Sequence, residues 1–146
     1  MMKKKIAAIL AGVQLLCAGS ALAAGTQPVT IRLNGTQLTL PAEAFIENDR
    51  TLVPLRGVFE AVGASVMWEP ETKSIFISKN IDGNMQAIIM QIGYTDVFVG
   101  EEKKSLDVAP KLVGDYTYVP LRFVIDELGE QVDWNGETYT VDITTK

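Results

Sequence analysis

The sequence predicts an α+β fold of one compact domain, built from two repeated β-β-α-β-β units. Three observations lead to this prediction. The chain aligns with itself at an offset of 66 residues, each copy holds one short apolar stripe with helical spacing, and segments of alternating apolar and polar residues flank each stripe. Because an open solenoid generally needs about three or more repeats, we expect the two units to close a single core.

Residues 1–23 are predicted to be a secretory signal peptide. Lys3-Lys4-Lys5 is basic, residues 6–17 are apolar and uncharged, and Ala21-Leu22-Ala23 has the small residues of a cleavage site. The alternative is a membrane anchor, but a spanning helix needs about 20 apolar residues and this stretch gives way earlier to small ones. We expect cleavage near Ala23 and a mature domain that does not span a membrane and is secreted, extracellular or at the cell envelope.

Charge and cysteine content restrict the partners of the mature domain, residues 24–146. The whole chain has 13 basic and 18 acidic residues, and loss of the three N-terminal lysines leaves a net charge of −8. This excess of acid argues against nucleic acid and anionic membranes as partners, because both bind basic patches. Cys17 lies within the predicted signal, so we expect no disulfide in the mature domain.

Each unit is predicted to begin with a β-hairpin. In the first unit, residues 29–33 and 37–40 alternate around Asn34-Gly35, a strong signal for a two-residue turn. The second unit has the same layout with a longer turn, over residues 94–99 and 103–108. The sequence thus predicts two equivalent hairpins.

Two further segments lie between the hairpins. Residues 86–92 are predicted to form an additional apolar strand, and residues 80–84 to connect the units, which span about 28–79 and 86–145. Asp82-Gly83-Asn84 resembles part of a calcium loop but lacks the later acidic ligands, so we interpret it as a turn.

A short helix is predicted in the middle of each unit, within "LVPLRGVFEAVGASVMW" and "YVPLRFVIDELGEQVDW". The proline suits the first helical turn, where its missing N–H is not needed. Positions i, i+3, i+4 and i+7 are apolar in both copies, and a glycine then supplies a left-handed C-cap. The residues are Leu55, Val58, Phe59, Val62 and Gly63 in one copy, and Leu121, Val124, Ile125, Leu128 and Gly129 in the other.

Each unit is predicted to end with two strands joined by a turn. Residues 65–69 and 131–135 each carry a tryptophan, and residues 74–79 and 139–144 alternate with their apolar side chains on one face. The order of elements in a unit is therefore two strands, a further short strand before the helix, the helix, and two strands.

The chain resembles the copper amine oxidase N-terminal domain-like family, which is widespread in secreted proteins of Gram-positive bacteria. The resemblance rests on "LNGTQLTL", "DRTLVPLRGVFEAVGASVMWEPETKSIFIS" and "YTYVPLRFVIDELGEQVDWNGETYTVDIT" and covers nearly all of the mature chain. It implies antiparallel sheets packed around the two short helices, and often a stalk or accessory module of cell-surface proteins. The second copy departs from the usual pattern at Glu130-Gln131 and Gly136, which does not affect the predicted fold.

The chain lacks the residues of a copper amine oxidase catalytic centre. Such a centre needs three histidine ligands and a modified tyrosine in an Asn-Tyr context, and this chain has neither histidine nor Asn-Tyr. Since histidine and cysteine are the usual ligands of copper and zinc, we expect no metal and no cofactor. No base is present to activate a serine or threonine, and no feature of the sequence places a pair of carboxylates. We therefore expect a protein that is not an enzyme.

The residues that recur in the two copies are predicted to be structural. Arg56 could pair with Glu60 and Arg122 with Asp126, or both could reach the recurring glutamates; an anion-binding clamp is the alternative. The tryptophans are expected to be half-buried in the core rather than stacked on a ligand. The recurring set is Pro54, Arg56, Gly63, Trp68, Glu71, Pro120, Arg122, Gly129, Trp134 and Glu137.

Four other aromatic residues are the better candidates for an exposed binding surface: Tyr94, Phe98, Tyr116 and Tyr118. The leading functional hypothesis is an exported accessory module that binds wall polysaccharide or an envelope protein through a sheet face or through loop aromatics. One alternative is a stalk or dimerisation domain without a ligand, since the sequence leaves a homo-oligomer open. The second alternative is a hydrolase based on carboxylates.

Overall fold

A computed structural model describes residues 27–145, and the predicted signal peptide lies outside the described residues. No helix within the described range is long and apolar enough to cross a membrane. The elements follow in the order β2 (Thr30–Leu33), β3 (Thr36–Gln37), β4 (Phe45–Glu47), β5 (Arg50–Pro54), α1 (Leu55–Ala61), β6 (Ser65–Glu69), β7 (Ser74–Ile81), β8 (Asn84–Gln91), β9 (Asp96–Val99), β10 (Glu102–Ser105), β11 (Lys111–Val113), β12 (Tyr116–Pro120), α2 (Leu121–Glu127), β13 (Gln131–Asn135) and β14 (Thr140–Thr144).

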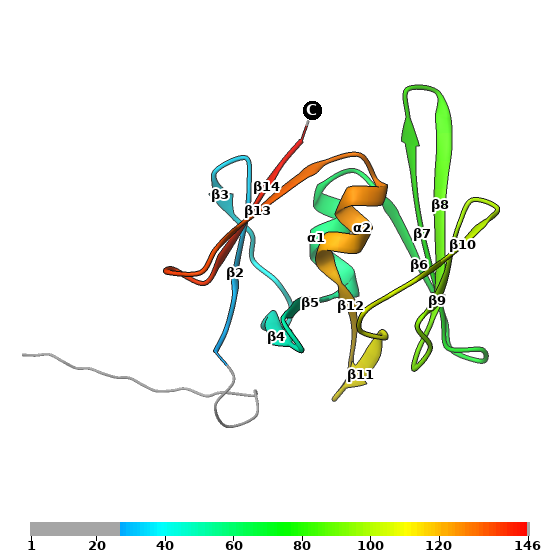
Figure 1. The fold of residues 1–146 in the computed structure, drawn as a ribbon, viewed down its shortest axis with the longest axis horizontal. Coiled ribbons are helices and arrows are strands. Elements are labelled where there is room, and N and C mark those ends of the chain that lie inside the picture. Colours follow the sequence, from blue (N-terminus) through cyan, green and yellow to red (C-terminus); the bar gives the residue numbers. More distant parts are fainter. Residues whose placement is uncertain (1–26, 146) are drawn as a thin grey trace, which may run out of the picture.

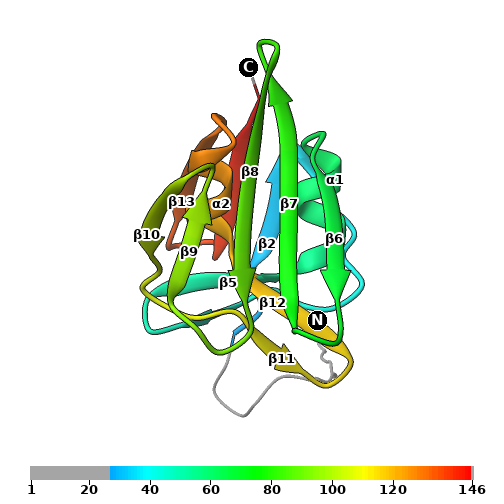
Figure 2. The same ribbon diagram turned by 90° about the vertical axis from the view of Figure 1, so that its right-hand side faces the viewer.

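The strands form three sheets around the two helices, which confirms a sheet-rich α+β fold (Figure 1). One sheet has the order β13-β14-β2-β3, a second β11-β12-β5-β4, and the third β10-β9-β8-β7-β6. All neighbouring strands in them are antiparallel except β14 and β2, which are parallel. The helices lie side by side, with the β13-β14-β2-β3 sheet on one side and the five-stranded sheet on the other (Figures 1 and 2).

The main core lies where both helices meet the inner faces of the sheets. The apolar stripes predicted for the helices are buried there, with Val58, Phe59, Val124 and Ile125 fully inaccessible. A smaller cluster on the far side of the β11-β12-β5-β4 sheet contains Phe45, Leu52, Val108 and Tyr118. Because each helix is only about two turns long, it cannot be stable alone and depends on burial of its stripe between the sheets.

The two helices begin differently although the sequence predicts the same start. Arg56 and Gly57 have non-helical backbone angles, with φ of +113° at Gly57, so regular helix in α1 begins only at Val58. In α2 the equivalent position is Phe123 and the helix is regular from Leu121. Only glycine adopts such an angle at low cost, and this explains why the similar sequences differ locally.

The predicted turns are present, although several strand bounds shift. Asn34 and Gly35 have φ of 50° and 87°, as a two-residue hairpin turn requires. Residues 80–84 include the turn expected there: Asp82 and Gly83 form a tight turn between the long strands β7 and β8, which extend into this segment from either side. Sequence reasoning placed one short strand before each helix and missed the additional strands β4 and β11.

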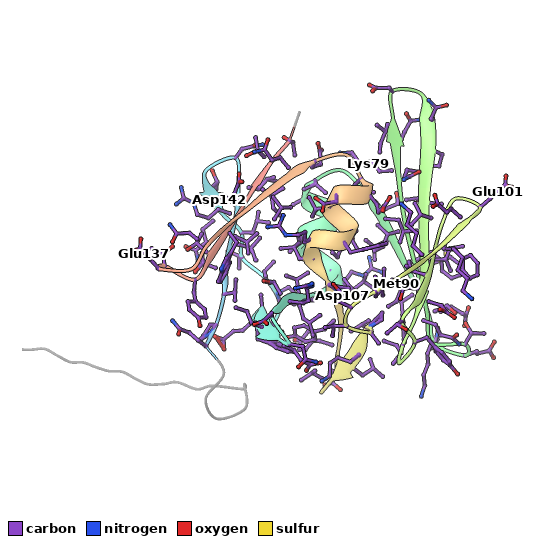
Figure 3. The ribbon with its side chains drawn as sticks, viewed as in Figure 1. Lys79, Met90, Glu101, Asp107, Glu137 and Asp142 are labelled. Atoms are coloured by element: carbon purple, nitrogen blue, oxygen red, sulfur yellow. The ribbon has the colours of Figure 1, made fainter. Side chains whose placement is uncertain are left out.

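Ion pairs attach the five-stranded sheet to α2. Lys79 of β7 donates a hydrogen bond of 2.7 Å to Glu130, which lies just beyond the end of α2 (Figure 3). Lys104 of β10 donates to Glu127 at 2.8 Å, and this hydrogen bond raises the pKa of Lys104 above its ordinary value. These contacts fix the sheet against the helix that carries part of the candidate site.

Candidate functional site

A cleft of about 750 Å³ lies beside α2. Its walls are α2, the β13–β14 hairpin, the start of β5, and the segment that joins β10 to β11. Buried apolar residues form its floor, and charged and aromatic residues surround them. The floor contains Leu106, Val108, Pro120, Leu121, Val132 and Val141, and the rim contains Asp49, Arg50, Asp107, Arg122, Asp126, Trp134 and Tyr139.

Arg122 lies on the exposed side of α2 and faces the cleft. Its Nη1 donates to the backbone carbonyl of Val132 at 3.3 Å, so the guanidinium reaches β13 rather than Asp126, which was the predicted partner. Its remaining N–H groups have no partner within residues 27–145 and can donate to a ligand. Figure 3 shows Glu137, the other predicted partner, at the tip of the β13–β14 hairpin and directed away from α2.

Trp134 is the most prominent aromatic residue of the cleft. It lies near the end of β13 with 41 % of its surface exposed, and its ring meets Tyr139 edge-on, with centroids 5.4 Å apart. A Cβ at Gly136 would lie 3.3 Å from Trp134 Nε1, so glycine at this position lets the indole lie close to the turn. The contact with Tyr139 restrains the indole without covering it, which suits a surface for stacking a ligand.

A salt bridge closes one side of the cleft. Nε and Nη2 of Arg50 both donate to Asp107 Oδ2, at 2.9 Å and 2.6 Å, and so join the start of β5 to the β10–β11 segment. Both side chains are largely exposed, so water weakens the pair and it contributes little to stability. The carboxylates of Asp49 and Asp126 also line the cleft and have no ion-pair partner in the described part of the chain.

The corresponding surface beside α1 is covered. Leu40 and Pro41 pack there so closely that a Cβ at Gly57 would lie 3.2 Å and 3.5 Å from their side chains. Sequence reasoning missed Arg50, Asp107 and Tyr139 as cleft residues. The sequence nevertheless contained a signal for part of the cleft, because the two copies differ at three equivalent positions that line it in the second copy. Gly57, Pro70 and Lys73 of the first copy correspond to Phe123, Gly136 and Tyr139 of the second.

The predicted exposed aromatics do not form one surface. Tyr94, Phe98 and Tyr116 are 57 %, 45 % and 42 % exposed, and none of them lines the cleft. The expectation that Tyr118 is exposed is wrong, because it packs on Phe45 and is 2 % exposed. Its side chain lies on the far face of the β11-β12-β5-β4 sheet, in the smaller cluster, where its hydroxyl donates to the carbonyl of Glu43 at 2.8 Å, and burial raises its pKa.

The other recurring residues have structural contacts. Arg56 pairs with Glu60 at 2.9 Å, as the spacing predicts, and Trp68 is half-buried against the main core. The backbone N–H groups of Glu71 and Glu137 bond to the side chains of Glu69 and Asn135, at equivalent places in the two turns. A left-handed φ of 93° at Gly63 and 84° at Gly129 follows each helix, as predicted.

The cleft offers no set of metal ligands. Within residues 27–145, no group of three or more His, Cys, Asp or Glu side chains is arranged to hold a metal ion. The cleft instead combines an aromatic face, guanidinium donors and carboxylate acceptors over an apolar floor. Such a combination can bind an uncharged polar ligand with an apolar face, such as a sugar ring, or the backbone of a peptide.

Comparison with known proteins agrees with the resemblance of the sequence. The copper amine oxidase N-terminal domain family model matches residues 32–143. A protein described as "Protease inhibitor" from Brevibacillus choshinensis is 31 % identical over 130 residues, which cover 84 % of this chain and 36 % of that protein. The chain thus spans little more than a third of the length of this curated relative. No solved structure matches the chain.

Proposed function

This chain belongs to the copper amine oxidase N-terminal domain family, and we propose that it is an exported, non-catalytic module that binds a ligand of the cell envelope in the cleft beside α2. The observation that carries the proposal is that exposed Trp134 and Arg122 line the same cleft, above an apolar floor. Export rests on the predicted signal peptide, residues 1–23, with cleavage near Ala23. The mature module would then be two copies of one unit, with the cleft lined mainly by the second copy and by the start of β5 from the first.

The leading ligand for this cleft is a segment of wall polysaccharide. The apolar C–H face of a sugar ring can lie flat on the exposed indole of Trp134. Vicinal hydroxyls can accept from the guanidinium of Arg122 and donate to the carboxylate of Asp126. The net negative charge of the mature domain disfavours polyanionic wall polymers, so the ligand would be an uncharged glycan.

A protein partner is the second candidate, because the relative from B. choshinensis is described as a protease inhibitor. Inhibition of a protease by a protein requires contact between two polypeptides. The same cleft could bind an extended peptide, with a side chain on Trp134 and backbone carbonyls bonded to Arg122. Because this chain matches only a small part of that relative, we propose a role in binding a protein and not the inhibition of a protease.

A retention experiment tests the proposal. Protein expressed from residues 1–146 is incubated with isolated cell-wall sacculi and separately with immobilised envelope extract, at low and at physiological salt. We expect retention on sacculi, with a loss of about tenfold in affinity for Trp134→Ala and for Arg122→Ala. Tyr94→Ala is the matched control, because Tyr94 is exposed but lies outside the cleft.

The outcomes separate the candidates. Retention of a single extract protein that depends on Trp134 would favour the protein partner over the glycan. Retention that Tyr94→Ala abolishes and Trp134→Ala leaves intact would place the site outside the cleft. No retention on either material would leave the stalk or dimerisation role as the better account of the protein.

A further inference from the structure

The five-stranded sheet carries a row of apolar side chains on its outer face. In the register of the sheet, Met67 lies opposite Phe76, Phe76 opposite Ile89, Ile89 opposite Phe98, and Phe98 opposite Lys103. The neighbouring residues in these strands, such as Ile75 and Ile88, are fully buried against the helices. Because side chains alternate along a strand, the row from Met67 to Lys103, here called the outer row, faces away from the helices, toward the viewer in Figure 2.

The apolar side chains of the outer row are exposed along most of its length. Met67, Ile89 and Phe98 are 62 %, 38 % and 45 % accessible, and Phe76 between them is half-buried. Ser78 and Ala87 lie beside the row on the same face, and because they are small they do not cover its larger side chains. Contiguous apolar surface of this kind, rich in methionine and aromatic residues and with polar surroundings, is typical of the centre of a protein interface.

We propose that this face binds a second copy of the chain, sheet against sheet, about a two-fold axis that runs along the strands, between the two sheets, and passes between Ile89 and its equivalent in the second copy. Ile89 lies on β8, the middle strand of the five. The axis therefore places Ile89 against Ile89 of the second copy and Phe76 against Phe98 of the second copy. Met67 then meets the aliphatic stem of Lys103 of the second copy, so the row is complementary to itself.

Charge selects this orientation over the alternatives. One edge strand, β10, carries Lys103, and the other edge strand, β6, carries Glu69 on the same outer face. An axis along the strands exchanges the two edges, so that each Lys103 lies beside Glu69 of the other copy. An axis along the row would instead place Lys103 on Lys103, and like charges across an interface are unfavourable.

The size of the face sets the strength of the association. The strands are about 4.8 Å apart; two of them are eight residues long and the other three have four or five, which gives a face of roughly 450–500 Å² in each copy. The total of about 900–1,000 Å² is below the range of stable interfaces and fits a weak, reversible association. We therefore expect a dimer that dissociates in the micromolar range.

Sedimentation equilibrium tests the dimer. Protein expressed from residues 1–146 is measured from about 1 µM to 500 µM, where an interface of this size should show both species. Ile89→Asp places two like charges at the axis and should weaken association at least about 100-fold. Leu112→Asp is the matched control, since Leu112 is similarly exposed, at 44 %, on β11 of another sheet and should leave the dimer unchanged.

A charge exchange tests the orientation. Lys103→Glu and Glu69→Lys should each weaken the dimer about tenfold, and the double variant should restore it. A monomer at all concentrations, or a dimer that Ile89→Asp does not affect, would overturn the proposal. Failure of the double variant to restore association would overturn the two-fold orientation. Far-UV circular dichroism checks that each variant folds. If Ile89→Asp does not fold, Phe98→Glu provides a second test of the same interface.

Discussion

Val53 on β5 and Val119 on β12 lie directly opposite each other at the centre of an antiparallel pair of strands. These valines are 66 residues apart, the offset at which the sequence aligns with itself. The flanking pairs have the same symmetry, because Leu52 faces Pro120 and Pro54 faces Tyr118. A two-fold axis between two copies of one unit would give this register, and we infer that such an axis passes between the two valines.

Truncation of the two valines should have matched effects on stability. Val53→Ala and Val119→Ala each remove methyl groups from a fully buried site, and we expect each to lower the free energy of unfolding by about 2 kcal/mol. Urea denaturation measures both values, and Gln37→Ala on exposed β3 should change stability by less than about 0.5 kcal/mol. Because the valines are in contact, the double variant should differ from the sum by at least about 0.5 kcal/mol. Strict additivity would contradict the contact.

The element types were predictable from the sequence because they depend on local patterns. The apolar stripes from Leu55 and Leu121 predict the helices, and Asn34-Gly35 predicts its turn, since these signals need only near neighbours. The pairing of β14 with β2 was not predictable, because it joins residues more than 100 positions apart. The start of regular helix at Val58 was not predicted, because the apolar spacing from Leu55 fits a regular helix equally well, and glycine permits the left-handed φ of Gly57 without requiring it.

The Lys79–Glu130 ion pair should matter more for stability than an exposed pair. Its side chains are 19 % and 7 % accessible, whereas those of Arg56 and Glu60 are 58 % and 43 % accessible. Lys79→Met leaves a buried carboxylate without this partner and should cost about 1–3 kcal/mol. Arg56→Met is the control and should cost less than about 0.5 kcal/mol. Equal costs in chemical denaturation would show that burial does not strengthen the Lys79 pair.

Tyr118 should make stability fall at alkaline pH. Burial raises its pKa, so the folded state holds the phenolic proton more tightly than the unfolded state does. Its contribution is therefore complete below the ordinary tyrosine pKa of about 10 and is lost as the pH rises from there through the higher pKa of the folded state. Between about pH 7 and pH 11, the urea midpoint should fall less steeply for Tyr118→Phe than for the parent protein. This variant should also lose about 1 kcal/mol of stability at neutral pH, because it lacks the hydrogen bond to Glu43. Tyr94→Phe, at an exposed position, should follow the parent protein; an unchanged slope for Tyr118→Phe would contradict the prediction.

The cleft was predictable only in part. Arg122 and Trp134 were recognised as notable because they recur, and recurrence favoured a structural role for both. Arg56 and Trp68 do have such roles, whereas Arg122 and Trp134 line the cleft. The difference comes from the covering segment, which packs on Gly57 in one half but leaves Phe123 beside an open space in the other. Only the tertiary structure shows which copy is covered.

Gly136 tests whether the position of Trp134 determines ligand binding. Gly136 does not have a left-handed φ, so alanine fits its backbone, but the new Cβ would lie 3.3 Å from the indole nitrogen of Trp134 and displace the ring. We expect Gly136→Ala to change the free energy of unfolding by less than about 0.5 kcal/mol and to shift tryptophan fluorescence. Retention on sacculi should fall by about three- to tenfold, because the stacking face moves relative to Arg122. Glu137→Ala, one residue further along the turn and directed away from α2, should change neither signal. A fluorescence shift without loss of retention would show that the ligand does not stack on Trp134.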